Sequence, residues 1–150
     1  MNARAVLVRF AGLHWFALSA LSVAGIAVSS YLTYSHYADE ATVCAGIGSC
    51  AFVQTSEYSE IVGVPVALMG LLYFVAVLSL STARLAGGAV RMPWAQPAVF
   101  SMALGGTALV TYLTYVELFI LEAVCIWCVS VATLTVLTLG VAIWGALAGE

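Results

Sequence analysis

The sequence contains no lysine and few charged residues of any kind. Asp, Glu, Lys and Arg make up 7% of the 150 residues, whereas a typical soluble domain carries about 25%. Hydrophobic residues make up 64% of the chain. This composition indicates a membrane protein rather than a soluble domain. With no lysine and four arginines there is also no basic patch and no nucleic-acid-binding motif, so nothing supports binding to DNA or RNA.

Charged residues are absent from four stretches of more than twenty residues, at 10–38, 61–83, 92–116 and 123–149. A membrane-spanning helix needs about 20 apolar residues, and a helix satisfies its own backbone hydrogen bonds in lipid. We therefore predict an all-α membrane protein, a four-transmembrane-helix bundle that forms a single domain over residues 1–150. The helices are expected near 11–35, 62–84, 97–118 and 124–146.

All four arginines are predicted to lie on one side of the membrane. Arg4 and Arg9 precede the first span, and Arg84 and Arg91 lie between the second and third spans. The positive-inside rule makes that side the cytoplasm. We therefore predict a multi-pass protein of the plasma (inner) membrane with both termini cytoplasmic. The other, external side is expected to hold the cysteines and the acidic residues Asp39, Glu40, Glu57, Glu60, Glu117 and Glu122.

The predicted external loop, residues 39–61, contains the first cysteine pair. Five small or apolar residues separate Cys44 from Cys50, and Gly46 and Gly48 among them free the backbone. This pair can close a small disulfide on a loop that can swing. Residues 51–60 contain few turn formers and are expected to include a short helix. The second span is expected to begin within 63–65, Gly-Val-Pro, because proline is well tolerated in the first turn of a helix.

The second cysteine pair, Cys125 and Cys128, opens the last apolar run. Residues three apart share one face of a helix, so Cys125 is expected near the external surface and Cys128 at the edge of the apolar phase. The start of a helix lowers the pKa of a thiol, which would activate Cys125. A pair placed in this way can take electrons from thiols in water and pass them to an acceptor in the bilayer.

Three interpretations of the four cysteines remain open. Two static disulfides are one, although a Cys-x-x-Cys pair is readily exchanged and makes a poor structural staple. A four-thiolate zinc site is another, but it requires reduced thiols in an oxidising space and the Cys-x5-Cys spacing is unusual for zinc. The third is a relay in which one pair reduces the other by thiol–disulfide exchange. We favour the relay and expect no bound metal.

Several motifs resemble the vitamin K epoxide reductase family, in particular its stand-alone bacterial-type members. They are the Cys-x5-Cys of the external loop, Ser56 six residues further on, Gly-Val-Pro at 63–65, and Cys-Ile-Trp-Cys-Val at 125–129. The likeness extends from Phe10 to Ala148. The other four-helix family that generates disulfides carries its Cys-x-x-Cys in the first loop and its spaced pair in the second, which is the reverse order.

The resemblance implies a role for each of these residues. Cys44 would exchange with a separate thioredoxin-fold protein of the DsbA type, and Cys50 would relay electrons to Cys125. Cys128 would face a membrane quinone, either menaquinone or ubiquinone, and Ser56 would help to position the relay. The chain would then be a quinone-dependent thiol–disulfide oxidoreductase that supports disulfide formation in exported proteins.

Beside Cys128, the candidate quinone contacts are Val66 and Met69, on the predicted second span, and Tyr112, near the external end of the third. The vertebrate enzyme of this family has an asparagine and a tyrosine where this chain has Val66 and Ala132, which argues against epoxide reduction. Two alternatives remain: a vitamin K epoxide or quinone reductase proper, and a non-enzymatic membrane protein with structural disulfides. We expect no Asp, Glu, Lys or Arg to line a pathway within the spans, which argues against a transporter.

Overall fold

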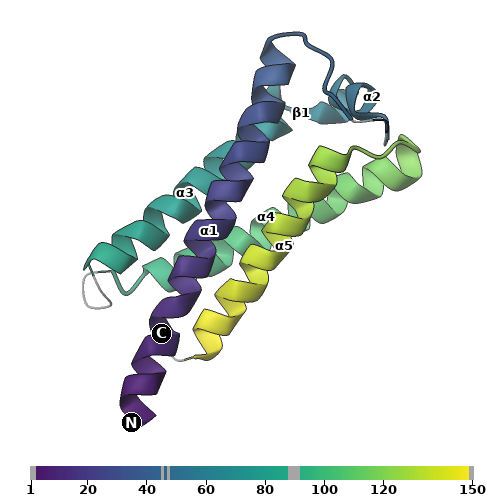
Figure 1. Ribbon diagram of the computed structural model, residues 1–150. Helices are drawn as coiled ribbons and strands as arrows, with labels where there is room; N and C mark the ends of the chain where they lie inside the picture. The colour runs from purple at the N-terminus through teal and green to yellow at the C-terminus, as the bar shows by residue number, and fades with distance from the viewer. Residues whose placement is uncertain (1–2, 45, 47, 88–91, 149–150) are drawn as a thin grey trace.

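Four long helices make up most of the computed structural model (Figure 1). The structure describes residues 3–44, 46, 48–87 and 92–148, and for residues 3–11 it describes the helical backbone alone. Two of its shorter elements are a 3₁₀ turn, η1, and a π-helical turn, η2. In chain order the elements are α1 (Ala3–Tyr37), α2 (Cys50–Gln54), η1 (Glu57–Ser59), β1 (Glu60–Ile61), β2 (Val64–Pro65), α3 (Val66–Gly87), α4 (Ala95–Tyr115), η2 (Val116–Ile120) and α5 (Ile126–Leu147).

Each long helix is long and apolar enough to cross a membrane. The four candidate spans are Gly12–Tyr37, Val66–Gly87, Ala95–Ile120 and Ile126–Leu147. The predicted all-α, four-helix membrane bundle with a short helix in its first long loop is therefore confirmed. The chain is a multi-pass membrane protein.

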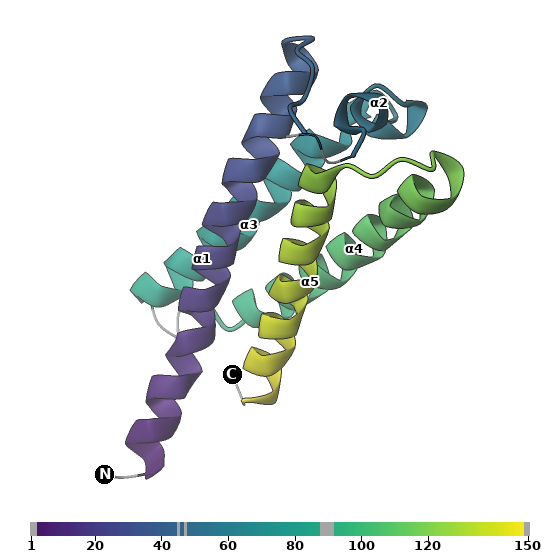
Figure 2. The ribbon, with the colours of Figure 1, turned by 45° about the vertical axis from the view of Figure 1, so that its right-hand side comes forward.

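The helices alternate in direction, so that α2 and the start of α5 lie at one end of the bundle, which we call the cysteine end (Figures 1 and 2). Helix α1 packs against α3 and α5, and α4 packs mainly against α5. Helices α3 and α4 diverge from their connection toward the cysteine end (Figures 1 and 2). This divergence makes room for a cavity between them.

The described arginines lie away from the cysteines. Arg4 and Arg9 fall in the first turns of α1, and Arg84 falls in the last turn of α3. The guanidinium of Arg84 lies 5.6 Å from the centre of the Trp15 ring, a cation–π contact that holds it against α1. Arg91 lies outside the described residues. The two ends of the bundle thus differ in charge as the sequence predicts.

The segment before α3 differs from our expectation. Residues 63–65 do not form the first turn of a helix; they belong to a hairpin in which Glu60 pairs with Pro65 and Ile61 pairs with Val64. Val62 and Gly63 make its turn with positive φ values of 54° and 77°, the conformation that a tight two-residue hairpin turn requires. Helix α3 therefore begins at Val66 rather than near 62.

Helices α1 and α3 approach closely at Gly25. The Phe74 side chain of α3 is fully buried, and a Cβ atom at Gly25 would collide with its ring. Small residues allow this kind of close approach between membrane helices, whose association depends on packing. The pair Gly25 and Phe74 therefore sets the spacing of α1 and α3.

We expect Gly25→Val to lower the melting temperature of the purified protein in detergent, measured by circular dichroism. Overpacking a close-packed interior costs about 1–3 kcal/mol. Gly140→Val on α5 is the matched control, because an added Cβ there meets nothing within 4 Å. Equal melting temperatures for the two variants would show that Gly25 does not set the helix spacing.

Candidate functional site

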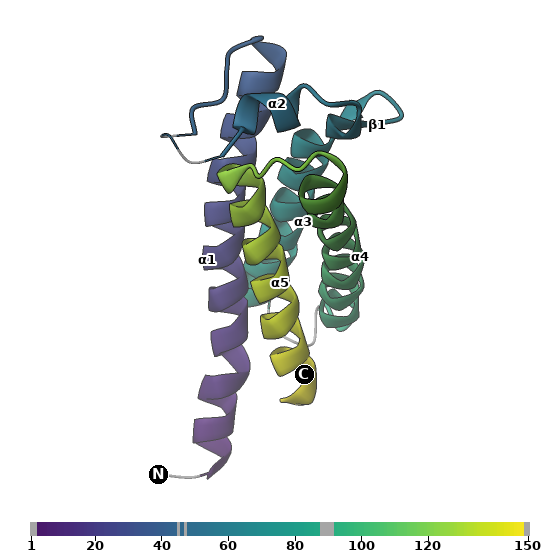
Figure 3. The same ribbon diagram turned by 90° about the vertical axis from the view of Figure 1, so that its right-hand side faces the viewer.

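The four cysteines gather in one cluster at the cysteine end of the bundle. Cys50 and Cys125 are buried together, and Cys44 and Cys128 pack against them. One pair comes from the loop after α1 and the other from the start of α5, so the cluster joins distant parts of the chain. Figure 3 shows α2, which Cys50 begins, above the start of α5.

Cys44 and Cys50 form a disulfide, with their Cα atoms 5.8 Å apart. The Cys50 N–H also donates a hydrogen bond to the Cys44 sulfur at 3.2 Å. Cys44 is partly exposed whereas Cys50 is 1% exposed. The disulfide thus presents one sulfur toward solvent and the other toward the second pair.

The disulfide loop is docked on the backbone that precedes α5. Gly48 forms an antiparallel bridge with Cys125, and Ser49 N–H donates to the Val124 carbonyl at 3.0 Å. Gly48 has a φ of 88°, and a Cβ there would collide with the Val124 carbonyl oxygen. Glycine is therefore required at this position for both its conformation and its lack of a side chain.

A second set of contacts holds the loop between α1 and α5. The Trp127 indole N–H donates to the Val43 carbonyl at 2.8 Å, and the Val43 N–H donates to the Tyr31 hydroxyl at 3.1 Å. The Tyr31 and Trp127 rings have centroids 5.0 Å apart. The glycines of the loop predict that it can swing; in this state contacts at Val43 and at Gly48–Ser49 hold it in place.

Cys125 and Cys128 are free thiols. Cys125 is the N-cap of α5, and its sulfur accepts a hydrogen bond from the Cys128 N–H at 3.4 Å. Hydrogen bonding from the Cys128 thiol and N–H lowers the pKa of Cys125 to about 7, against the opposing effects of burial and of nearby Glu117. The lowered pKa favours the thiolate form of Cys125, which is the form that reacts in thiol–disulfide exchange.

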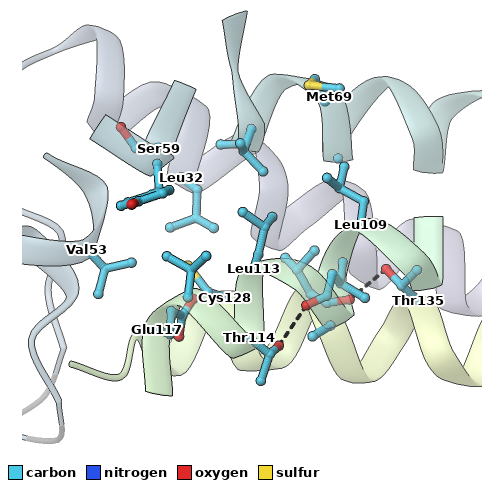
Figure 4. Close-up of a pocket in the computed structure, with 18 of the residues that line it drawn as sticks. Leu32, Val53, Ser59, Met69, Leu109, Leu113, Thr114, Glu117, Cys128 and Thr135 are labelled. Atoms are coloured by element: carbon cyan, nitrogen blue, oxygen red, sulfur yellow. Dashed lines mark hydrogen bonds between the residues drawn. The ribbon is translucent and has the colours of Figure 1, made fainter. Parts of the chain in front are cut away.

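Cys128 faces a cavity of about 270 Å³ between α3 and α4. Most of the lining side chains are apolar, and α2, the turn that follows it and η1 contribute to the wall at the cysteine end. In Figure 4, Cys128, Glu117 and Val53 lie toward one end of the cavity. The other end is lined by Met69, Leu109 and Thr135. The cavity thus extends from the second cysteine pair into the membrane-spanning part of the bundle.

The predicted quinone contacts divide into two groups. Val66, Met69 and Cys128 all line the cavity, as does Ala132. Tyr112 is not among the lining residues, and 52% of its side chain is exposed. Tyr112 therefore does not contact a molecule bound in this cavity.

Ser56 lies in the turn that follows α2. Its hydroxyl donates to the Val53 carbonyl at 2.7 Å, and its side chain lines the cavity. Ser56 therefore fixes the end of the short helix that Cys50 begins. Its predicted part in positioning the relay remains a prediction.

Two residues beside Cys128 are not among those that the sequence predicts for the site. The Gln54 side-chain amide donates to the Cys128 sulfur at 3.8 Å. Glu117, which we expected at the external surface, is 7% exposed, lies within the third span and lines the cavity. The expectation that no acidic residue lines a pathway within the spans was therefore wrong. The sequence gives little indication of this, because Glu117 directly follows the charge-free run 92–116. An acid at that position can lie either at the membrane surface or inside the bundle.

The docked loop leads to a test of the contact at Gly48. In a Cys44→Ala, Cys128→Ala background, we expect mild oxidation to join Cys50 to Cys125, because both are buried in one cluster. Adding Gly48→Ala should weaken docking by about 1–3 kcal/mol, which is roughly 5–150-fold. The disulfide should form correspondingly more slowly, as measured by gel shift after alkylation with a large maleimide.

Gly46→Ala is the matched control for this experiment. Gly46 shares a positive φ of 80°, but an added Cβ there meets nothing within 4 Å. Slowing by Gly48→Ala alone isolates the collision with Val124. Equal slowing by both substitutions would mean that backbone strain, rather than this contact, controls docking.

Four membrane-spanning helices that bring a disulfide against a dithiol define a membrane protein with redox-active cysteines. The model of the vitamin K epoxide reductase family matches residues 16–143. The chain therefore belongs to the vitamin K epoxide reductase family, as its cysteine motifs predict. Membership in this family implies a membrane oxidoreductase that works through its cysteines.

Proposed function

We propose that this protein oxidises the dithiol of a separate thioredoxin-fold partner and passes the electrons through its two cysteine pairs to a membrane quinone. This activity would support disulfide formation in exported proteins. The observation that carries the proposal is the placement of Cys128, which belongs to the cysteine cluster and also faces the apolar cavity. A single residue thus connects thiol exchange with a site for an apolar acceptor.

The cavity fits the ring of a quinone in its chemistry. Ligand pockets are mostly apolar with a few polar groups and occupy about 300–1,000 Å³, and this cavity is close to the lower end of that range at about 270 Å³. Val66 and Met69 would contact the ring, and Cys128 would lie at its reacting edge. A quinone supplies a two-electron acceptor that takes up two protons and leaves as the quinol.

The first exchange takes place at the loop disulfide. A partner thiolate attacks the Cys44 sulfur, which is the more exposed of the two, and Cys50 leaves as a thiolate. The partner's second thiolate then breaks the mixed disulfide and frees Cys44. The partner leaves oxidised, and the loop pair has gained two electrons and holds two sulfhydryl groups after proton uptake.

The second exchange takes place inside the cluster. The Cys50 thiolate attacks the Cys125 sulfur of a Cys125–Cys128 disulfide, and Cys128 leaves as a thiolate. Cys44 then attacks Cys50, which closes the loop disulfide and releases Cys125. A thiol of lower pKa leaves faster, so the lowered pKa of Cys125 favours this release. The product is the state in this structure, with a loop disulfide and a free Cys125 and Cys128.

We also propose an orientation of the bundle in the membrane. The described arginines lie at the end of the bundle opposite the cysteines, and the positive-inside rule assigns that end to the cytoplasm. We propose a plasma (inner) membrane protein with both termini cytoplasmic and its cysteines external. Partner thiols outside the cytoplasm would then reach Cys44 directly.

The roles of the cysteines can be separated with two reductants. Cys44→Ala should abolish quinone reduction driven by a reduced thioredoxin-fold partner but retain most of the reduction driven by dithiothreitol, which can reach the second pair directly. Cys128→Ala should abolish quinone reduction with either reductant. Equal loss in Cys44→Ala with both reductants would contradict the division between a shuttle pair and a reaction pair.

The same assay distinguishes the acceptor, with vitamin K epoxide offered in place of quinone. The positions that carry polar contacts in the vertebrate enzyme are Val66 and Ala132, and both line this cavity. We expect quinone to be reduced and the epoxide not. Faster turnover of the epoxide would overturn the proposed acceptor class.

Filling the cavity should stop the last step alone. We expect Met69→Trp to lower quinone reduction by about tenfold or more, since a loss of about 1.4 kcal/mol in acceptor binding is tenfold in affinity. Exchange with the partner, measured by trapping mixed disulfides, should be retained. Leu72→Trp is the control, because Leu72 is 60% exposed on the same helix and does not line the cavity. Normal quinone reduction in Met69→Trp would place the acceptor elsewhere.

A further inference from the structure

Glu117 is a buried carboxyl whose position depends on an irregular end to α4. The helix continues into the π-helical turn η2, where Leu121 N–H donates to the Val116 carbonyl at 2.9 Å. Glu122 then adopts a positive φ of 48°, and the chain returns toward η2. The Cys125 N–H donates to the Glu117 Oε2 at 3.3 Å. The π turn and the turn at Glu122 thus return the chain so that the start of α5 lies against the Glu117 carboxyl, and π turns occur frequently at functional sites.

Glu117 also contacts the cysteine that faces the cavity. Its carboxyl lies close enough to the Cys128 thiol for the two groups to interact, and the two side chains lie at the same end of the cavity in Figure 4. Among the described residues that line the cavity, Glu117 is the one Asp, Glu, Lys, Arg or His. The other titratable groups that line the cavity are the thiol of Cys128 and the hydroxyls of Tyr58 and Tyr73. Cys125 contacts Glu117 through its backbone N–H.

An ionisable side chain within a membrane span is costly and points to a function. The thiol relay described above does not use Glu117, because each of its exchanges occurs between sulfur atoms. The transfer from dithiol to quinone, in contrast, must also move protons. The carboxyl lies beside the thiol that loses a proton, and it lines the same cavity in which an acceptor would gain one.

We propose that Glu117 is the proton-transfer residue of the quinone-reducing step, an inference that rests on the proposed function. Glu117 takes the proton of the Cys128 thiol, so that an S–H bond breaks and an O–H bond forms on the carboxyl. As the Cys125–Cys128 disulfide closes and releases two electrons, Glu117 donates that proton to a quinone oxygen. The proton of Cys125 has already passed to water when Cys125 is a thiolate, and the second proton of the quinol returns from water at the cysteine end.

The test is Glu117→Gln. The glutamine oxygen can still accept the hydrogen bond from the Cys125 N–H, but the amide cannot carry a proton between acid and base forms. We expect dithiothreitol-driven quinone reduction to fall by roughly 10²-fold or more, the usual range for losing a general acid or base. Exchange between the loop pair and the second pair should not change. Glu117→Asp, which keeps a carboxyl, should recover part of the rate.

Glu122→Gln is the matched control, since Glu122 is an exposed acid in the same connection. It should reduce quinone at the wild-type rate. A wild-type rate in Glu117→Gln would overturn the proposal. So would an equal loss in Glu117→Asp and Glu117→Gln accompanied by failed cysteine exchange, because that pattern indicates a purely structural role.

A measurement without quinone separates this proposal from the proposed function. Rapid-scan infrared spectra, recorded while a chemical oxidant closes the second pair, should contain a transient carboxyl C=O band that shifts in D₂O, is absent in Glu117→Gln and persists in Glu122→Gln. The band is expected even if the natural acceptor is not a quinone. A wild-type protein that reduces quinone but shows no such band would refute proton transfer by Glu117.

Discussion

The antiparallel contact between residues 48–49 and residues 124–125 is the interaction on which the site depends. It joins two backbone segments that are far apart in sequence, and it brings a disulfide and a dithiol into one buried cluster. It also fixes the residue before α5, so that Cys125 can cap the helix with its sulfur. Packing, helix capping and the lowered pKa of Cys125 therefore share one backbone contact that excludes a side chain at Gly48.

Much of this architecture could be predicted from the sequence because it follows from composition. Apolar runs long enough to span a membrane force helices, and the arginines separate from the cysteines along the chain. The hairpin before α3 could not be predicted in the same way, because Pro65 is as acceptable in a helix's first turn as it is at the end of a short strand. The hairpin depends on the turn at Val62–Gly63, where both residues have positive φ. A pattern of apolar residues does not reveal such a turn.

The candidate site shows the same division between pattern and three-dimensional arrangement. The cysteine spacings predicted two pairs, and the family resemblance and the apolar start of the second span led to Val66 and Met69, which line the cavity. The direction of Tyr112 could not be predicted without knowing how α4 packs against the other helices. Glu117 lies four residues after Leu113 on the helix face that lines the cavity, but its place at the end of a charge-free run is equally typical of an acid at the membrane surface. Gln54 and Glu117, the polar residues beside Cys128, are therefore the part of the site that could not be predicted from the sequence.

The divergence of α3 and α4 has a consequence for access to the cavity. The cavity lies between these two helices, while the loop that carries the disulfide is docked on the backbone that precedes α5. A small molecule that enters the cavity between these helices therefore need not break the backbone contact that docks the loop.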